Sequence, residues 1–373
     1  MKLTIINKTN WENVYVKLYK RCRRTNEVIK LEFENNVATL DVNLNKWLYL
    51  FLNNGEDIST EIIILSENLD TISLEYNQKK ECYDAYLVNQ NTHYNQVLNY
   101  TLKDEKNLFY REDKSKNIHV WLPNDYDINK KYGILLMFDG QNLFDKRNVG
   151  DYTTLNDPYG SWQVDVSMES VKKHVPNTDY IVVGIENADF MRMNELMVNE
   201  TFGIIRDKKE LHGYPFVGYL DNLNDFINET LFSFICQNFS IDMNKVGIAG
   251  SSCGGIASHY VGLKNLGLYK FILCYTPASG LYEDVSWDNF YKRLNLKENH
   301  DKLPYFYYFQ GKKDPLEKLL TKANKNLIQM LLENGYDDSL IDIYMEPKAF
   351  HNETAWRYAF NYMILKTFNK INK

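Results

Sequence analysis

The chain has 373 residues, of which 44% are hydrophobic and 25% are charged. This balance is typical of a folded globular protein and excludes a mainly disordered, collagen-like or coiled-coil chain. Because domains average roughly 150 residues, the length predicts one large and one small domain. The net charge is −6 and the sequence contains no basic block, which argues against a nucleic-acid partner bound through its phosphates.

Targeting signals and cysteine usage favour a cytoplasmic protein. The first 20 residues lack the apolar run and the small-residue cleavage site of a signal peptide. No stretch of 18 uninterrupted apolar residues predicts a membrane span. The cysteines are scattered and none forms a CxxC pair: Cys22, Cys82, Cys236, Cys253 and Cys274. This spacing argues against a disulfide framework and against a zinc site.

Residues 1–90 have the pattern of a small antiparallel β-sandwich. Their short apolar runs are separated by turn-forming Asn, Gly and Asp residues. Several runs alternate apolar and polar residues, as at Val14, Val16 and Leu18, which is the period of a strand with one buried face. Residues 91–99 are predicted to connect this sandwich to the rest of the chain.

Residues 100–373 alternate strand-like and helix-like segments. The strand-like apolar runs are 118–122, 133–138, 180–185, 246–249, 271–275, 305–309 and 341–345. The run 134–138 contains no polar residue, as expected for a strand that is buried on both faces. Helix-like stretches lie between the runs, most clearly at 221–237 and 316–334. The alternation predicts an α/β domain with a mostly parallel sheet.

The sharpest motif is a G-x-S-x-G sequence from Gly250 to Gly254, centred on Ser252. A chance match in a chain of this composition is expected on the order of 0.03 times. A strand-like run precedes the motif and a helix-compatible run follows it, which is the setting of a nucleophile elbow. The glycines allow close packing around the sharp turn, and the helix N-terminus favours negative charge there. The simpler alternative is a Gly/Ser turn without a chemical role.

A nucleophilic serine needs a base and an acid that orients the base. In α/β-hydrolases the acid and then the histidine follow the serine along the chain. Three histidines follow Ser252. His259 lies about two turns along the elbow helix, and His300 lies in a charged run that is typical of a surface. His351 comes after a strand-like run and a short loop, so we predict that it is the base.

The predicted acid is Asp314, which comes directly after a strand-like run, and Glu317 is the second choice. An oxyanion hole also needs two backbone N–H donors. We assign these donors to Cys253, the residue after the nucleophile, and to Gln141, in the loop after the buried run 134–138. The Cys253 side chain itself is expected to be small, buried and without a redox role.

Segments spread over roughly residues 100–370 together resemble the putative-esterase family of α/β-hydrolases. The segments are HVWLPNDYD, YGILLMFDGQNLFD, SWQVD, IVVGIEN with a following R-x-x-E, KVGIAGSSCGG, FQGKKD and FHNETAW. The family includes enterochelin and related siderophore esterases, feruloyl and acetyl-xylan esterases, S-formylglutathione hydrolase and mycolyltransferases. The resemblance implies an α/β-hydrolase fold, with helices on both faces of a mostly parallel sheet. It also implies the same triad and oxyanion donors that the residues predict: Ser252, Asp314, His351, Gln141 and Cys253.

Two further features of the resemblance concern the surroundings of the site. Arg192 and Glu195 match the R-x-x-E segment of the family, and we expect a structural ion pair there. Residues 196–216 lack the family's usual tyrosine–proline spacing. We expect this segment to form a lid or a substrate-binding loop.

The N-terminal segments NWENVYVKLYK and WLYLFLNNGED are similar to starch-binding-type β-sandwich modules. In such modules exposed aromatic rings stack on glucose, so Trp11 and Trp47 are the predicted platform for a glycan ligand. The alternative is that both rings belong to the core or to an interface. Enterochelin esterases also carry an N-terminal β-sandwich, so the layout alone does not separate a sugar from a siderophore substrate.

Together these features predict a serine carboxylic-ester hydrolase that acts through an acyl-enzyme and requires neither a metal nor an organic cofactor. The expected substrate is a small-molecule ester of a siderophore or a carbohydrate. Two alternatives remain open: a glycan-binding protein with a hydrolase-like scaffold, and an acyltransferase with the same triad. Neither nucleic acid nor a membrane is an expected partner.

Overall fold

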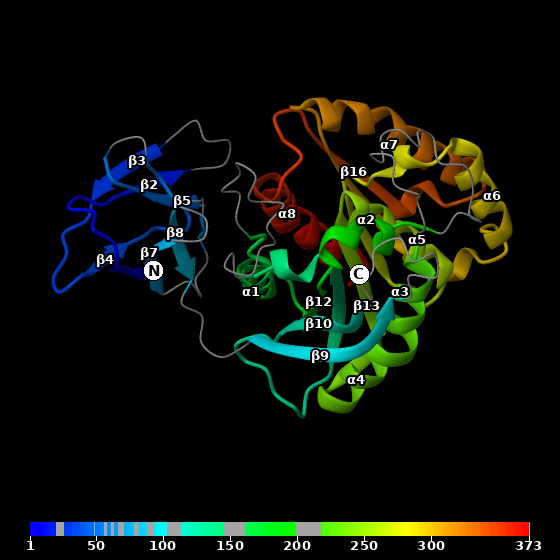
Figure 1. Ribbon diagram of the computed structural model, residues 1–373, viewed down its shortest axis with the longest axis horizontal. Coiled ribbons are helices and arrows are strands. Elements are labelled where there is room, and N and C mark those ends of the chain that lie inside the picture. Colours follow the sequence, from blue (N-terminus) through cyan, green and yellow to red (C-terminus); the bar gives the residue numbers. More distant parts are fainter. Residues whose placement is uncertain are drawn as a thin grey trace. The chain divides into compact units, whose positions relative to one another are not determined.

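The computed structural model describes residues 1–19, 26–47, 49–55, 58–60, 63–65, 71–77, 82–87, 93–102, 113–144, 161–198 and 218–372. Contacts group the chain into two compact units (Figure 1). The first unit comprises residues 1–92 with 141–176, and the second comprises 93–140 with 177–373. The domain limits expected at residues 90 and 100 remain predictions. Within the predicted connector, residues 93–99 lie in a strand, β9 (His93–Leu102).

Two small sheets form the N-terminal part of the first unit. The strands of the first sheet, in spatial order, are β4 (Val37–Asp41), β1 (Lys2–Asn7), β7 (Thr71–Asn77) and β8 (Cys82–Leu87). Those of the second are β3 (Asn26–Lys30), β2 (Tyr15–Tyr19), β5 (Tyr49–Asn53) and β6 (Ile63–Ile64). All neighbouring strands are antiparallel except β1 and β7, which are parallel. Val14, Val16 and Leu18 are buried as their spacing predicts, in a core shared by both sheets.

The two tryptophans predicted to form a glycan platform lie in this shared core. Trp11 is only 9% exposed and Trp47 only 4%. The ring of Trp11 packs on that of Tyr83, with centroids 4.6 Å apart, and Lys46 Nζ lies 4.5 Å from the centre of the Trp47 ring. A stacking platform needs an open ring face, so the structure corrects this prediction. Burying such large rings stabilises the fold of this small unit.

The same unit contains one longer helix, α1 (Val164–His174), and most of a short turn, η1 (Gly140–Asn142), that follows strand β11 of the second unit. Gln163, the residue before α1, has a φ of 51°.

The second unit is built on one eight-stranded sheet, with the spatial order β16-β15-β14-β13-β11-β12-β10-β9. Its further strands are β10 (Asp113–Trp121), β11 (Tyr132–Phe138), β12 (Tyr180–Ile185), β13 (Ile241–Ser251), β14 (Phe271–Tyr275), β15 (Tyr305–Gly311) and β16 (Ile341–Glu346). From β16 to β12 all neighbours are parallel, and β10 and β9 are antiparallel additions at one edge. This arrangement confirms the predicted mostly parallel sheet.

At least one helix follows each of the strands β12 to β16 in the second unit. These helices are α2 (Arg192–Leu196), α3 (Leu220–Phe226), α4 (Phe232–Asn238), α5 (Cys253–Lys264), α6 (Asp284–Leu294), α7 (Pro315–Glu333) and α8 (Glu353–Ile371). A single π-helical turn, η6 (Ile227–Leu231), joins α3 to α4, so the predicted helix 221–237 is one continuous but irregular helix. Among the described helices, none combines the length and apolar character needed to cross a membrane.

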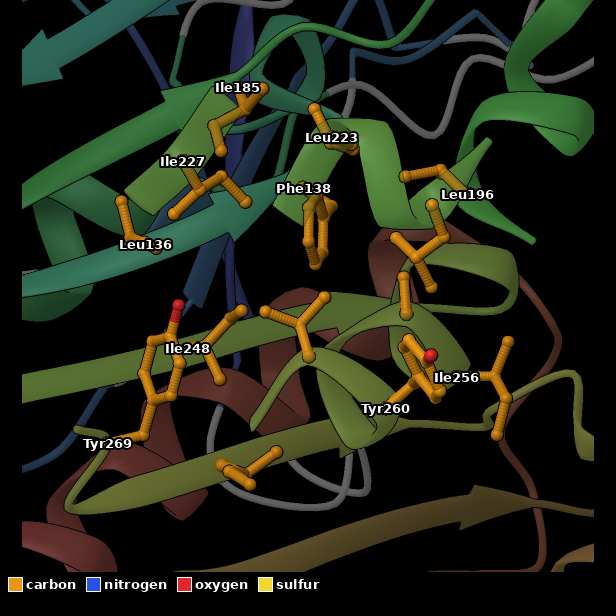
Figure 2. Close-up of a cluster of buried hydrophobic side chains, with 14 of the residues drawn as sticks. Leu136, Phe138, Ile185, Leu196, Leu223, Ile227, Ile248, Ile256, Tyr260 and Tyr269 are labelled. Atoms are coloured by element: carbon orange, nitrogen blue, oxygen red, sulfur yellow. The ribbon is translucent and has the colours of Figure 1, made fainter. Parts of the chain in front are cut away.

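Helices cover both faces of this sheet. Side chains alternate along each strand: Ile272 and Cys274 of β14 join a large core cluster with residues of α3 to α7, whereas Phe271 packs on Phe368 of α8, with ring centroids 5.7 Å apart. Figure 2 shows part of the large cluster, with Leu136 and Ile248 of the central strands facing residues of the helices. Because both faces are covered, β11, β12, β14 and β15 are buried along their whole length.

Candidate active site

Ser252 stands at a sharp turn between strand β13 and helix α5. Its φ of 54° and ψ of −117° lie outside the regions that non-glycine residues favour. The turn is held by two backbone hydrogen bonds: Ser252 N–H donates to Tyr275 O, and Ala278 N–H donates to Ser252 O, each over 2.9 Å. A strained serine between a central strand and a helix is the geometry of a nucleophile elbow.

The glycines of the motif are explained by close backbone contacts. A Cβ atom on Gly250 would lie 2.4 Å from the carbonyl oxygen of Gly254, which is closer than real Cβ atoms come. A Cβ on Gly254 would lie 3.1 Å from Asp139 Oδ2 and from the Cβ of Phe138. Side chains at these positions would therefore open the turn that presents Ser252.

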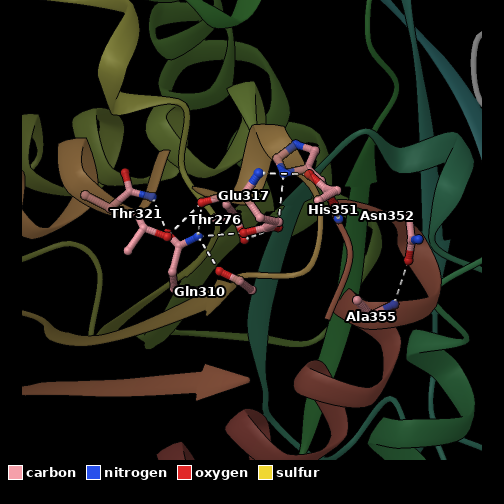
Figure 3. Close-up of polar contacts among 10 residues, drawn as sticks. Thr276, Gln310, Glu317, Thr321, His351, Asn352 and Ala355 are labelled. Atoms are coloured by element: carbon pink, nitrogen blue, oxygen red, sulfur yellow. Dashed lines mark hydrogen bonds and ion pairs between the residues drawn. The ribbon is translucent and has the colours of Figure 1, made fainter. Parts of the chain in front are cut away.

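His351 lies in the loop between β16 and α8, and its ring contacts a glutamate. His351 Nδ1 is 3.1 Å from Glu317 Oε1 (Figure 3). Glu317 is fully buried at the third position of α7, while the His351 side chain is 11% exposed. The Trp356 ring meets the imidazole edge-on, with centroids 5.0 Å apart. A carboxylate in this position can orient the imidazole and stabilise its positive charge.

Asp314, the predicted acid, makes different contacts. It is the N-cap of α7, and its Oδ1 accepts the Glu317 N–H over 2.9 Å. Its Oδ2 accepts the His351 backbone N–H over 2.6 Å. Asp314 therefore ties the start of α7 to the histidine loop, but the structure brings Glu317, rather than Asp314, to the imidazole. The reason is local, because an aspartate at a helix N-cap is drawn to the free N–H groups of the first turn.

These residues meet at the carboxyl edge of adjacent parallel strands. Ser252 N–H donates to Tyr275 O at the end of β14, and the next residue, Thr276, donates from Oγ1 to Glu317 Oε1 over 2.9 Å. Glu317 Oε1 in turn contacts His351. A short run of contacts thus links the strained serine to the Glu317–His351 pair.

Glu317 is held on its other side by β15. Gln310 Nε2 donates to Glu317 Oε2 over 2.5 Å. Gly311 leaves room for the carboxyl group, since a Cβ there would lie 2.8 Å from Glu317 Cδ. A buried carboxylate without partners would be very costly, and these donors satisfy both of its oxygens.

Arg192 and Glu195 do not pair with each other, which corrects the expected ion pair. Arg192 forms a two-point contact with Asp139, with Nε 2.6 Å from Oδ1 and Nη2 2.7 Å from Oδ2. Asp139 follows β11 with a φ of 57° and lies beside the elbow at Gly254. Glu195 points elsewhere and forms a fully buried ion pair with Lys116 of β10, which the sequence did not single out.

Replacing Lys116 by methionine is expected to destabilise the protein by about 3 kcal/mol, because it leaves Glu195 buried without its cation. Burial already raises the pKa of Glu195. Urea unfolding of the variant would measure the loss. As a control, the double variant Lys116→Met/Glu195→Gln should recover much of the stability. Equal losses in the single and double variants would contradict this interpretation.

The two predicted oxyanion donors lie in suitable local settings. Cys253 begins α5 directly after Ser252, and burial raises the pKa of its thiol, in keeping with a side chain that is not a thiolate. Gln141 is buried in η1, directly after β11. The oxyanion hole formed by their backbone amides remains a prediction.

The other two histidines after Ser252 make contacts that do not involve the proposed site. His259 is fully buried between the hydroxyls of Tyr308 and Tyr291, at 2.9 and 2.7 Å, and burial lowers its pKa to about 3. His300 is exposed and lies 3.1 Å from Asp337. Neither histidine contacts the Glu317–His351 pair.

Of the segment predicted as a lid, residues 199–216 lie outside the described residues. In the part of the chain that the structure describes, no three His, Cys, Asp or Glu side chains gather in a way that could hold a metal ion.

A family model described as "Putative esterase" matches residues 112–367, which is most of the chain. The chain belongs to this esterase family. The protein is therefore an ester-hydrolysing enzyme, as the sequence predicts. No curated protein matches the sequence.

Solved structures of two siderophore hydrolases and a ferulic acid esterase are similar to this chain. The siderophore hydrolase EstA from Aspergillus nidulans is 14% identical with a TM-score of 0.51, over 72% of this chain and 93% of its own. The siderophore hydrolase EstB from the same organism is 15% identical with a TM-score of 0.50, over 73% and 95%. A ferulic acid esterase from Anaeromyces mucronatus is 18% identical with a TM-score of 0.48, over 76% and 94%. The first two similarities support the α/β-hydrolase fold of this esterase.

Proposed function

We propose that this esterase cleaves carboxylic esters through an acyl-enzyme on Ser252, with His351 as the base and Glu317 as the acid. The observation that carries the proposal is the contact of His351 Nδ1 with the buried Glu317 carboxylate, at the same sheet edge as the strained serine. Chain order supports it, because serine, acid and histidine follow one another as in other α/β-hydrolases.

The roles of the two imidazole nitrogens follow from this contact. Since Nδ1 faces Glu317, Nε2 is the nitrogen that takes the Ser252 proton when Oγ attacks the acyl carbon. The N–H groups of Cys253 and Gln141 would stabilise the oxyanion, helped by the N-terminus of α5. The protonated imidazole then gives its proton to the leaving alcohol, and water releases the acyl group.

For the substrate we propose an ester of a siderophore or of a carbohydrate. The sequence resemblance and the siderophore hydrolases EstA and EstB support the first class. A panel of catecholate trilactones, feruloyl sugars, acetyl sugars and short acyl esters would separate the classes through their kcat/KM values. A glycan-binding role would have to use residues other than Trp11 and Trp47, which are buried. We also propose that the enzyme acts in the cytoplasm.

Covalent labelling tests the proposed nucleophile. A fluorophosphonate should add one label, and peptide mass spectrometry should locate it on Ser252. Ser251 is a matched control, because it is the neighbouring serine and is 3% exposed at the end of β13. We expect the Ser251→Ala variant to be labelled and the Ser252→Ala variant not. Labelling of Ser252→Ala at the wild-type rate would overturn the proposal.

A further inference from the structure

The carboxylate of Glu317 lies at the end of a chain of buried, uncharged side chains. Ser279 Oγ donates to Asn324 Oδ1 over 2.5 Å, and Asn324 Nδ2 donates to Gln310 Oε1 over 2.7 Å. Gln310 Nε2 then donates to Glu317 Oε2 over 2.5 Å. All four side chains are at most 5% exposed. Ser279, Asn324 and Gln310 are called the relay below.

The direction of the relay is determined by its surroundings. Gln310 Nε2 faces the Glu317 carboxylate and also the carbonyl oxygens of Gly311 and Glu317, at 2.9 and 3.1 Å. Its Oε1 faces the Asn324 amide donor. A flipped Gln310 amide would place an oxygen against three acceptors, so only one orientation is satisfied. Every hydrogen bond of the relay therefore donates toward Glu317.

Glu317 receives little help from other charges. The titratable groups that face it are His351, at Oε1, and Asp314, whose carboxylate accepts the Glu317 N–H. Within the described residues, no lysine or arginine forms an ion pair with Glu317. Its negative charge is therefore supported mainly by neutral donors, which are the relay and Thr276.

We propose that the relay residues are positioning residues that supply a hydrogen-bond donor to the Glu317 carboxylate and hold it directed at His351. Aligned hydrogen bonds polarise one another and stabilise a negative charge at their end. The proposal rests on the proposed roles of Glu317 and His351, and it adds Ser279, Asn324 and Gln310 to the residues on which the reaction depends.

The consequence is a defined change in the pH profile. The proposed base is the neutral form of His351, whose Nδ1 faces the Glu317 carboxylate. Without Gln310 Nε2 one carboxylate oxygen of Glu317 loses its donor, so the carboxylate attracts a proton on the neighbouring imidazole more strongly. The acid limb of kcat/KM, which reports the free enzyme, then moves upward.

The experiment is a graded series of variants in the full-length enzyme, assayed with p-nitrophenyl acetate across pH. We expect Gln310→Met to raise the acid limb by about 1 pH unit and to keep most of its activity on the alkaline plateau. Asn324→Leu and Ser279→Ala should shift the limb in the same direction by less, because they lie farther from Glu317. Gln329→Met is the matched control, since Gln329 is an exposed residue of α7, the helix that carries Glu317 and Asn324. Its pH profile should equal that of the wild type.

A loss of rate by the same factor at every pH, with an unmoved limb, would show that the relay is only structural and would overturn the proposal. Thermal unfolding would check that each variant folds. If Gln310→Met does not fold, Asn324→Leu and Ser279→Ala decide by the same criterion. Ser252→Ala, assayed beside them, keeps the outcomes separate: activity in that variant contradicts the proposed function, whereas an unmoved limb contradicts only the relay.

Discussion

Replacing Ser252 by alanine is expected to lower kcat/KM for a p-nitrophenyl ester by about 10⁴-fold or more. The substitution removes the attacking oxygen while the imidazole, its carboxylate and the backbone donors remain. The change deletes only one side-chain atom and leaves the backbone of the turn as it is. The fold should therefore be retained. Initial rates, with thermal unfolding as a check of folding, would measure the effect.

Ser251→Ala provides the comparison for this experiment. Ser251 is the last residue of β13 and lies next to Ser252 in the same turn. We expect its loss to change kcat/KM by less than about tenfold, since the residue has no chemical role in the mechanism. If Ser251→Ala were inactive and Ser252→Ala retained turnover, the nucleophile would be misassigned.

Replacing Glu317 by glutamine should lower kcat by about 10³- to 10⁴-fold. The loss expected at Asp314 is much smaller. Glutamine has nearly the same shape as glutamate but carries no charge to stabilise the imidazolium. To accept the hydrogen bond from Gln310 Nε2, the new glutamine would turn its amide oxygen toward Gln310. Its NH2 group would then face His351 Nδ1, which favours a wrong orientation of the His351 ring. Steady-state kinetics of the purified variant would measure the loss.

Asp314→Asn separates the two carboxylates. Asparagine can still act as an N-cap, but it accepts only one of the two backbone hydrogen bonds that Asp314 accepts. We therefore expect a loss of about 1 kcal/mol in stability and of at most about tenfold in kcat. A larger loss of kcat in Asp314→Asn than in Glu317→Gln would return the role of the acid to Asp314.

Local sequence alone does not determine which carboxylate, Asp314 or Glu317, contacts His351. Asp314-Pro315-Leu316-Glu317 has an N-cap residue, a proline at the first helical position and a glutamate three residues after the cap. Such a pattern is typical of a capped helix start, and in the structure Asp314 is the N-cap of α7 rather than the partner of the imidazole that we predicted. The usual capping box would also turn the glutamate back to the cap. Here the Glu317 side chain goes inward instead, because His351, Gln310 and Thr276 approach from other elements.

The predictions at the R-x-x-E segment and at the N-terminal tryptophans were wrong for the same reason. Arg192 and Glu195 are three residues apart on one short helix, a spacing that allows them to pair. Each instead meets an opposite charge from another segment: Arg192 meets Asp139, which follows β11, and Glu195 meets Lys116 of β10. Trp11 and Trp47 lie next to strand-like segments, but only the packing of the two sheets decides that their rings are buried.

The sequence by itself determined what depends on neighbours along the chain. Strand runs without polar residues predicted the buried parallel sheet, and the glycines around Ser252 predicted the turn between β13 and α5. The tertiary structure alone decided which carboxylate meets His351, which charges pair, and which polar side chains line up behind Glu317. The physical reason is that these contacts join residues on different strands, helices and loops, most of them tens of positions apart, and their geometry depends on how these elements pack.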